Sequence, residues 1–330
     1  MPDFKDKTLL ITGGTGSFGR AMVERLIGTD IKEIRIFSRS GGKQEQMRQE
    51  LQAKHPAEAG KVRFVAGDIR SLEDCRSAME GVDYVFHAAA MKLIPECEQA
   101  PMDALYVNVV GSHNVVSAAV EAGAEAVVCL STDKAAYPIN VMGLSKAFEE
   151  RVAFFRARES RTRVCCTRYG NVLMSQGSVI PLWIGQIRKG LPVTLTSAEM
   201  TRFIMTLPEA VDLVLFALEH GRTGDVFVQK SPACTIGTQA QAVCELFRHS
   251  RPDRESPEIR VIGLRPGEKM YETLLTKEEA VKAEDMGEYY RVPTLGPAAA
   301  VPVLNEEFNS DNARRMGVEE MVEKINRLLA

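Results

Sequence analysis

Short apolar runs alternate with helix-like segments through the first half of the chain. Six runs are typical of β-strands: Lys7–Thr12, Ile31–Arg39, Lys61–Asp68, Tyr84–Ala90, Ala126–Ser131 and Arg163–Gly170. Segments with helical patterning, such as 71–80 and 102–123, lie between them. Strands that alternate with helices form parallel sheets, and nearly continuous apolar strands are covered on both faces. With right-handed crossovers, the pattern predicts an α/β fold built on a doubly wound parallel sheet.

The regular alternation fades after about Gly170. The second half carries most of the prolines and mixes short apolar runs at 192–196, 225–230 and 259–263 with helical segments. This change predicts two domains, a first over residues 1–172 and a smaller α+β domain over residues 173–330. The apolar segment 203–220 is a candidate to return to the first domain. No internal repeat is visible.

Composition and charge narrow the class of protein. The chain has 330 residues, 45% of them hydrophobic, and a formal net charge of −3, which gives no support for binding to nucleic acid or an acidic membrane. No apolar run approaches the ~20 residues that span a bilayer, and the N-terminus lacks a signal-peptide pattern. Seven cysteines without a CxxC pair argue against a disulfide framework, and Cys129 and Cys165 are expected as buried thiols. We expect a soluble, reduced, cytoplasmic protein.

A glycine-rich turn follows the first expected strand. Gly13, Gly16 and Gly19 have the G-x-x-G-x-x-G spacing and open a helical segment. At such a position the first glycine allows a tight turn, the second lets a pyrophosphate approach the backbone, and the third lets helix and strand pack closely. The helix N-terminus then faces the anion. We therefore expect a dinucleotide-binding Rossmann domain, with a ligand-free glycine turn as the alternative.

The end of the second expected strand distinguishes NAD from NADP. NAD sites commonly place a carboxylate there, whereas this chain has Ser38-Arg39-Ser40, with Lys43 close behind. Arginine can form paired hydrogen bonds with a 2′-phosphate, which favours NADP. The alternative is a surface arginine at a strand end. The other residues expected to contact the cofactor are Thr15, Ser17, Phe18, Asp68, Ile69, Ala88, Ala89, Ala90, Lys92, Asn108 and Lys146.

Several longer motifs carry a resemblance to a known family. They are GGTGSFG (13–19), GDIR (67–70), FHAAAMK (86–92), STDKAAYPINVMGLSK (131–146), TRYGNVLMSQGSVIP (167–181), MTRFIMT (200–206), GDVFVQK (224–230) and RPGEKMYETLL (265–275). From Lys5 to about Gly317 the chain resembles the extended short-chain dehydrogenase/reductase family. Within it, the chain is similar to the inverting UDP-N-acetylglucosamine 4,6-dehydratases, and its M-G-x-S-K form resembles the N-acetyl-L-fucosamine branch of capsule and O-antigen synthesis.

The resemblance implies a lyase with internal redox. In that family hydride leaves C4 for NADP⁺, the ketone acidifies H5, water is eliminated across C5 and C6, and hydride returns to C6. The product is a UDP-2-acetamido-2,6-dideoxy-4-hexulose. Members of the branch also invert C5 and are credited with C3 epimerisation. A UDP-sugar is thus the expected partner, and the chain is expected to form a homo-oligomer.

The segment Thr132-Asp133-Lys134 ends the fifth expected strand, at the edge where parallel sheets bind ligands. An adjacent Asp and Lys supply an acid and a base. A Lys that is partly desolvated beside a cationic nicotinamide would have its pKa lowered toward neutral. By resemblance, Asp133 would protonate the leaving hydroxyl and Lys134 would handle H5. The alternative is an ion pair that only caps a strand end.

Lys146 lies four residues after Met142, where short-chain dehydrogenases usually have a tyrosine. Residues four apart share one helix face, so both are expected to face the cofactor. By resemblance, Lys146 would bind the nicotinamide ribose. Met142 would shape the pocket, because a thioether cannot transfer a proton. The group that removes the C4 hydroxyl proton therefore stays open among Lys134, a water molecule and Lys92.

Residues for the nucleotide sugar come mainly from the resemblance. Gly177-Ser178-Val179 offers backbone donors at a helix start, which suit a phosphate. The remaining expected contacts are Lys92, Thr132, Asn171, Arg202, Arg265 and Glu268. His87 follows an apolar strand and is expected to be an interior histidine. No His, Cys and Asp grouping has metal-ligand spacing, so no metal is expected.

Three functions remain in competition. The first is the inverting dehydratase, and the second is a 4-epimerase or a retaining dehydratase of the same superfamily. The third is a catalytically silent NADP-binding regulator. An epimerase would leave the 6-hydroxyl in place and is expected to keep a tyrosine at position 142. A regulator would explain Met142 but leaves the TDK and RPGEK segments unexplained. The sequence does not fix the hexose, the extent of C3 epimerisation or the number of subunits.

Overall fold

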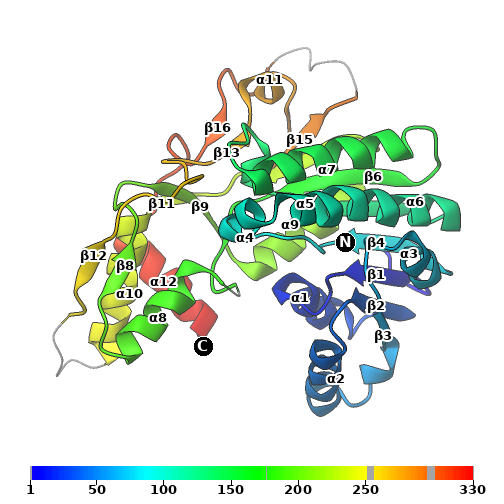
Figure 1. The fold of residues 1–330 in the computed structure, drawn as a ribbon, viewed down its shortest axis with the longest axis horizontal. Helices are drawn as coiled ribbons and strands as arrows, with labels where there is room; N and C mark the ends of the chain where they lie inside the picture. Colours follow the sequence, from blue (N-terminus) through cyan, green and yellow to red (C-terminus); the bar gives the residue numbers. More distant parts are fainter. Residues whose placement is uncertain (1, 176, 251–255, 296–301, 330) are drawn as a thin grey trace.

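The computed structural model describes residues 2–175, 177–250, 256–295 and 302–329. Its main sheet has nine strands in the order β14-β15-β10-β6-β5-β4-β1-β2-β3 (Figure 1). The first six strands of the chain are parallel, β10 joins β6 in parallel, and β15 and β14 follow in antiparallel pairing. The strands are β1 (Thr8–Thr12), β2 (Glu33–Ser38), β3 (Val62–Ala66), β4 (Tyr84–His87), β5 (Ala126–Leu130), β6 (Arg163–Arg168), β10 (Asp225–Gln229), β14 (Glu284–Asp285) and β15 (Tyr289–Pro293). The predicted doubly wound parallel sheet is confirmed.

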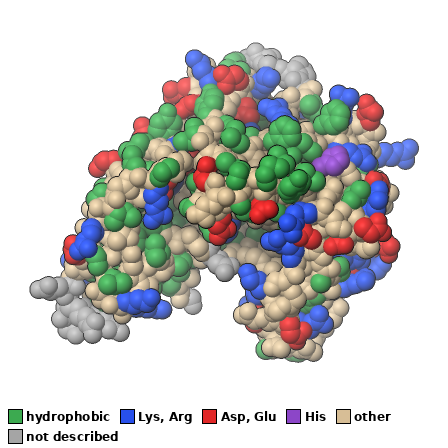
Figure 2. Space-filling view, viewed as in Figure 1, with side chains coloured by type: hydrophobic (Ala, Val, Ile, Leu, Met, Phe, Trp, Pro, Cys, Tyr) green, Lys and Arg blue, Asp and Glu red, His purple; other side chains and the backbone are tan. Residues whose placement is uncertain are grey.

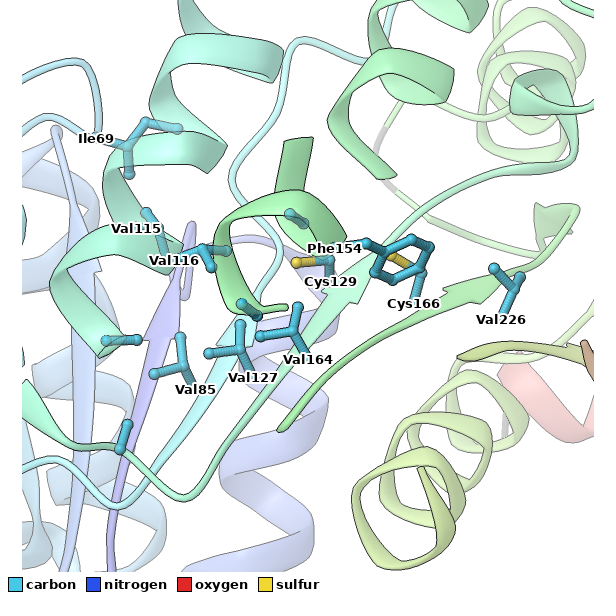
Figure 3. Packing of buried hydrophobic residues seen from close by; sticks show 14 of the residues in the cluster. Ile69, Val85, Val115, Val116, Val127, Cys129, Phe154, Val164, Cys166 and Val226 are labelled. Atoms are coloured by element: carbon cyan, nitrogen blue, oxygen red, sulfur yellow. The ribbon is translucent and has the colours of Figure 1, made fainter. Parts of the chain in front are cut away.

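Helices cover both faces of this sheet because its strands are apolar on both sides. In β1, Leu9 and Ile11 pack into one hydrophobic core and Leu10 into the other. The first core includes α1 (Ser17–Leu26), α2 (Gly41–Lys54) and α9 (Leu207–His220), and the second includes α3 (Leu72–Met79), α6 (Ser112–Ala122) and α7 (Val141–Ala157). Figure 3 shows part of the second core, where Phe154 of α7 lies near Cys129 and Cys166 of the sheet.

Short helical pieces complete the connections of the first half. They are η1 (Ala59–Lys61), α4 (Ile94–Gln99), α5 (Pro101–Ala104), the π-helical segment η2 (Leu105–Gly111) and η3 (Asp133–Ala135). A π-helical turn inside a longer helix is rare and often lies at a functional site. Here η2 carries the buried Asn108, whose side chain bonds to the backbone N–H and C=O of Met91. The loop after β4 is thereby fixed in place.

The second half forms a smaller unit with its own core. Trp183 is fully buried there and donates its indole N–H to the carbonyl of Thr194 at 2.6 Å. The strands form three small sheets: β11 (Ala233–Thr235), β9 (Thr201–Met205) and β7 (Asn171–Val172); β12 (Ile259–Val261) and β8 (Val193–Leu195); β13 (Thr273–Leu275) and β16 (Phe308–Asn309). The helices are α8 (Val179–Arg188), α10 (Ile236–Ser250), α11 (Lys277–Ala280) and α12 (Val318–Leu329). In the space-filling view the molecule is notched between this unit and the part that carries α2 (Figure 2).

Segments after residue 172 return to the main sheet and to the helices that cover it. Helix α9, within the segment 203–220, packs against α1, β5 and β6. The run 225–230, which the sequence pattern placed in the smaller domain, forms β10 of the main sheet instead. It fits there because Val226 and Phe227 are buried on opposite faces. The domain boundary at residue 172 stays a prediction. Later segments of the chain complete the main sheet.

A buried ion-pair network joins the two halves of the chain. The guanidinium of Arg168 in β6 donates to both carboxylate oxygens of Glu150 in α7 and to both of Glu279 in α11. Ser131 also donates to Glu150, at 2.6 Å. Such a network is costly to break, because one lost partner leaves a buried charge uncompensated.

Two further sequence expectations concern the thiols and membranes. All seven cysteines are buried free thiols, including Cys129 and Cys165, as predicted for these two. Across the part of the chain that the structure describes, no helix combines the length and apolarity needed to cross a bilayer.

Candidate active site

The carboxyl ends of β1, β2, β4, β5 and β6 meet at one edge of the sheet, where a cavity of about 560 Å³ lies. Crevices at this edge are the usual ligand sites of doubly wound folds. Most residues that the sequence pointed to line this cavity. They are Gly13, Thr15, Gly16, Ser17, Phe18, Ser38, Arg39, Lys43, Asp68, Ile69, Ala88, Ala89, Ala90, Lys92, Thr132, Lys134, Met142, Lys146 and Asn171.

Nine expected residues do not line the cavity. These are Gly19, Asn108, Asp133, Gly177, Ser178, Val179, Arg202, Arg265 and Glu268. Gly19 packs helix α1 onto the turn, since a Cβ there would lie 2.1 Å from the carbonyl oxygen of Gly14. Asn108 holds the loop after β4 through Met91, as described above. These two residues shape the walls from behind.

The glycine turn leaves room for a ligand close to the backbone. Gly13 has φ +63°, and a Cβ on it would lie 2.8 Å from the Cα of Ala89 at the end of β4. Only glycine fits such a close approach at a positive φ. Helix α1 begins at Ser17 without a side-chain cap or an acidic residue in its first turn. The positive end of the helix therefore suits a pyrophosphate, so the residues present fit a dinucleotide.

At the far end of the cavity lie Ser38, Arg39, Ser40 and Lys43. The hydroxyl of Ser40 caps helix α2 by accepting from the backbone N–H of Lys43 at 3.3 Å. No acidic residue occupies the end of β2, where Ser38 is followed by Arg39. The arrangement provides cationic groups where a ribose phosphate would lie in such a fold.

Asp133, which is fully buried, and Lys134, which is partly exposed, form an ion pair on η3, shortly after β5. Nζ of Lys134 lies 2.9 Å from Oδ1 of Asp133 and 3.5 Å from Oε1 of Glu272, the residue before β13. Lys134 lines the cavity, whereas Asp133 and Glu272 lie behind it and are almost fully buried. The second carboxylate oxygens, Oδ2 and Oε2, have no hydrogen-bond partner among the described residues. This cluster thus joins the ammonium of Lys134 to the carboxylates of Asp133 and Glu272.

This cluster corrects the expected behaviour of Lys134. Burial lowers the pKa of Lys134, but the attraction of Asp133 and Glu272 outweighs it, so the pKa is raised. The prediction of a lowered pKa is therefore wrong for this arrangement. The physical reason is the attraction of Asp133, the larger contribution, together with that of Glu272, a second buried carboxylate that the sequence analysis did not place near Lys134. No sequence pattern could indicate this contact, because 138 residues separate Glu272 from Lys134 (272 − 134).

Lys146 has an acidic partner of its own. Its Nζ donates to the carbonyl of Leu130 at 2.8 Å and to Oε2 of Glu149, and both side chains are buried. Burial raises the pKa of Glu149 to about 7. Met142 lies one helical turn before Lys146, lines the same cavity and packs against Cys97 and Ala104. The shared face predicted for Met142 and Lys146 is confirmed.

Glu149 was also missed from the sequence, although its spacing of three residues from Lys146 on a helix was a usable signal. Tyr169, after β6, lines the cavity too, and burial raises the pKa of its phenol. The other lining residues outside the predicted set are Phe37, Gly67, Met91, Val107, Leu130, Ser131, Gly170, Val172, Ser175, Leu207 and Ala210, as well as Ser40.

The residues expected at the sugar nucleotide divide into two groups. Lys92, Thr132 and Asn171 line the cavity, next to Lys134. Ser178 caps the start of α8 with its backbone, and its buried hydroxyl has no partner among the described residues. A buried hydroxyl without a partner is costly, so a ligand at this helix start would satisfy it. Gly177, at φ +81°, and Val179 flank this position.

Arg202, Arg265 and Glu268 do not line the cavity. Arg202 is buried in β9 and donates to the carbonyl of Thr201 at 2.7 Å. Arg265 is exposed, and its backbone N–H donates to the side chain of Glu268 at 3.3 Å. The cavity wall therefore gives no support to the expectation that these three residues contact the substrate. Arg202 is held in a small sheet, and Arg265 and Glu268 hydrogen-bond within their own turn.

That turn instead docks onto the loop between η3 and α7. The ammonium of Lys269 donates to the carbonyls of Ala136 and Tyr137, and the side chain of Asn140 donates to the carbonyl of Gly267 at 2.9 Å. The RPGEK motif thus packs over the back of the Asp133–Lys134 segment. His87, as predicted, is an interior histidine bonded to hydroxyls, and burial lowers its pKa to about 3. In the described ranges, no group of three or more His, Cys, Asp or Glu could hold a metal.

Comparison with known proteins places these features in context. A family model described as "Polysaccharide biosynthesis protein" matches residues 9–294. A Rickettsia canadensis protein named UDP-glucose 4-epimerase is 50% identical over 339 residues, covering 98% of this chain and 96% of its own. The X-ray structure of Pen from Bacillus thuringiensis superposes with a TM-score of 0.91 at 35% identity and covers 98% of each chain.

A more distant structure is the dTDP-glucose 4,6-dehydratase DesIV from Streptomyces venezuelae, solved with NAD bound. It superposes with a TM-score of 0.68 at 22% identity, over 80% of this chain and 86% of that chain. At that identity the likeness concerns the fold alone.

Proposed function

From the premise that the chain belongs to the polysaccharide biosynthesis protein family, we propose that it is a UDP-N-acetylglucosamine 4,6-dehydratase that inverts C5. The observation that carries the proposal is the Asp133–Lys134 ion pair, whose lysine lines a cavity that fits a dinucleotide. A dehydratase needs an acid and a base next to a hydride carrier, and this arrangement supplies them. The inversion rests on the resemblance of the M-G-x-S-K segment, and C3 epimerisation is proposed on the same ground.

The residues around the cavity would hold the cofactor, which we propose to be NADP. Gly13, Gly16 and the N-terminus of α1 would bind the pyrophosphate, and Arg39 with Lys43 would bind the 2′-phosphate. Lys146, held by Leu130 and Glu149, would bind the nicotinamide ribose. When bound, the cofactor supplies hydride transfer from C4 and back to C6.

The chain's own residues would handle the protons. Lys134 lines the cavity and would take H5. Asp133 lies behind Lys134, and its proton would reach the departing C6 hydroxyl through Nζ of Lys134, which is 2.9 Å from Oδ1 of Asp133. Met142 is buried against the wall and transfers no proton, so it would exclude water from the nicotinamide end. Thr132, Asn171 and Ser178 would orient the sugar nucleotide.

A second candidate function is a nucleotide-sugar 4-epimerase, and the observation that favours it is the name of the Rickettsia relatives. An epimerase and a dehydratase both begin by oxidising C4, and they differ in whether the 6-hydroxyl is lost. Met142 weighs against the epimerase, because position 142 lacks the tyrosine expected for it.

One incubation separates the two functions. UDP-N-acetylglucosamine would be mixed with pure protein and a catalytic amount of cofactor in D₂O, and the product analysed by mass spectrometry and NMR. The dehydratase yields a product that lacks one water and carries deuterium at C5 in the L-configuration, without net cofactor reduction. A product with an unchanged formula and an inverted C4 would establish the epimerase and refute our proposal.

We also propose that the protein is a cytoplasmic homo-oligomer. Helix α7 exposes Leu144, Phe148 and Phe155 along one side, and Met102 and Tyr106 of the neighbouring α5 and η2 extend this apolar face (Figure 2). The side chain of Phe155 is 71% exposed. Apolar faces of this kind are usually covered in an assembly, and two copies related by a twofold axis would cover each other. The buried thiols suit a reducing compartment.

A further inference from the structure

Glu272 shares Lys134 with Asp133 and is the third ionisable group of this cluster. It is almost fully buried, and its Oε1 lies 3.5 Å from Nζ of Lys134. One oxygen of each carboxylate, Oε2 of Glu272 and Oδ2 of Asp133, is buried without a partner in the described part of the chain. Two carboxylates that face one ammonium in a buried place repel each other, so one of them favours the neutral form.

The position of Glu272 is fixed by the backbone. Its N–H donates to the hydroxyl of Ser310 at 3.0 Å, and its carbonyl accepts from the N–H of Ser310 at 2.8 Å. Ser310 in turn bonds through its hydroxyl to Thr201 of β9. Because these contacts tie three chain segments together, the carboxylate of Glu272 is held against Lys134 by the scaffold.

The cluster poses a problem for Lys134 as a base. An ammonium accepts no proton, so Lys134 must first pass one on, and Asp133 at 2.9 Å is the nearest acceptor. With both carboxylates ionised, that transfer would leave Glu272 beside a neutral amine and would forfeit its attraction to the ammonium. With Glu272 neutral, the transfer costs much less.

We propose that Glu272 controls whether Lys134 can act as a base: when neutral it allows Lys134 to pass a proton to Asp133, and when ionised it holds Lys134 as a cation. This inference rests on the proposed dehydratase function. In the step, an Nζ–H bond breaks and an Oδ1–H bond forms. Neutral Lys134 then takes H5 as a proton, and the C5–H electrons form the C5–C6 double bond. The C6–O bond breaks as Lys134 protonates the departing oxygen, which leaves as water, and Asp133 returns its proton to Lys134 across the 2.9 Å contact, so that the ion pair is restored. Glu272 touches neither substrate nor cofactor and is a positioning residue.

The charged groups around Glu272 influence the pH at which its carboxyl group ionises. Asp133 and Lys134 face it from η3, Arg202 from β9 and Lys269 from the segment before β13. Burial raises the pKa of Glu272, and the three cations offset this only in part. Below its raised pKa, Glu272 is neutral and Lys134 is free to act. As pH rises through that pKa, Glu272 ionises and activity should fall, which gives an alkaline limb in the pH profile.

The test compares Glu272→Gln and Glu272→Leu, both permanently neutral, with the wild type. Water elimination from UDP-N-acetylglucosamine is measured from pH 5 to 10, and the titration of Lys134 is followed by NMR of ¹³C-labelled lysine, assigned with Lys134→Ala. We expect both variants to lose the alkaline limb and the pKa of Lys134 to fall. Each pKa unit of that fall multiplies the neutral fraction of Lys134 about tenfold. The matched control is Glu279→Gln, a buried carboxylate paired with Arg168, which should change neither.

The two readouts separate the inference from the function. If the wild type eliminates no water, the proposed function fails, and the lysine titration alone decides the role of Glu272. An unchanged Lys134 pKa in both neutral variants overturns the inference, as does an alkaline limb that persists in them. A uniform loss of activity at every pH, with an unchanged limb, would mean that Glu272 only supports the fold.

Discussion

Replacing Glu149 with Gln tests how the partner of Lys146 titrates. Glu149 is fully buried, and burial raises its pKa from 4.5 to about 7. With this raised pKa, the folded protein keeps a proton that the unfolded chain has already lost between these pH values. The wild type therefore loses stability as pH rises from about 4.5 to 7, whereas the glutamine variant, neutral throughout, does not.

The size of the effect follows from the same interval. From 4.5 to about 7, at 1.36 kcal/mol per pKa unit, the wild type should lose roughly 3 kcal/mol relative to Glu149→Gln. Removing the carboxylate also unpairs Lys146, which adds an offset at every pH. The informative quantity is thus the change with pH of the difference between the two proteins, measured by urea unfolding at pH 4, 5, 6, 7 and 8.

Glu279→Gln is the matched control, because the pKa of Glu279 is shifted in the opposite direction from that of Glu149. Burial raises the pKa of Glu279, but the pairing with Arg168 outweighs it, so the pKa is lowered. Its stabilisation is present above the unfolded value and is lost only as pH falls through the lowered pKa. The difference from wild type should therefore stay constant from pH 6 to 8. If the Glu149→Gln difference is equally constant from pH 4 to 8, Glu149 does not titrate in this range and the reasoning is wrong.

Three further predictions concern the cofactor, the protons and the assembly. Arg39→Ala should weaken NADP binding roughly ten- to a hundredfold, the value of one charge-assisted contact, and leave NAD binding unchanged; equal affinity of the wild type for both cofactors in a titration would refute the NADP assignment. Lys134→Ala should lower turnover by ~10²–10⁴-fold, because it removes a proton-transfer group, whereas Met142→Ala should show a smaller loss that reflects packing alone. Equal inactivity of the two folded variants would show that Met142 does more than shape the cavity wall. Phe148→Asp on the exposed side of α7 should shift the protein toward monomers in sedimentation; an unchanged assembly would place the interface elsewhere.

The main sheet and the cavity wall could be predicted because their signals are local. The apolar runs that form β1 to β6 are continuous, and the turn at Gly13 to Gly19 follows directly on the first of them. Residues at the ends of parallel strands then meet at one edge without any long-range information. That is why Arg39, Asp68 and Thr132 all line one cavity.

The misplaced features depend on contacts between distant segments. Glu272 meets Lys134 only because β13 pairs with β16 and Ser310 fixes the preceding residue. Arg265 and Glu268 were expected at the substrate from the resemblance; they hydrogen-bond to each other within their turn, and their contact with the substrate stays a prediction. The run at 225–230 is as apolar as the first six strands, but no periodicity tells which sheet it joins.

The path of the chain has a consequence for how its specificity can change. The polypeptide leaves the main sheet after β6, returns for α9 and β10, leaves again, and comes back once more for β14 and β15. Neither half is a contiguous stretch that recombination could replace as a cassette. A fragment ending at residue 172 would also expose the edge of β6 that β10 covers. New substrates are therefore more accessible through point substitutions in the loops around the cavity than through exchange of a domain.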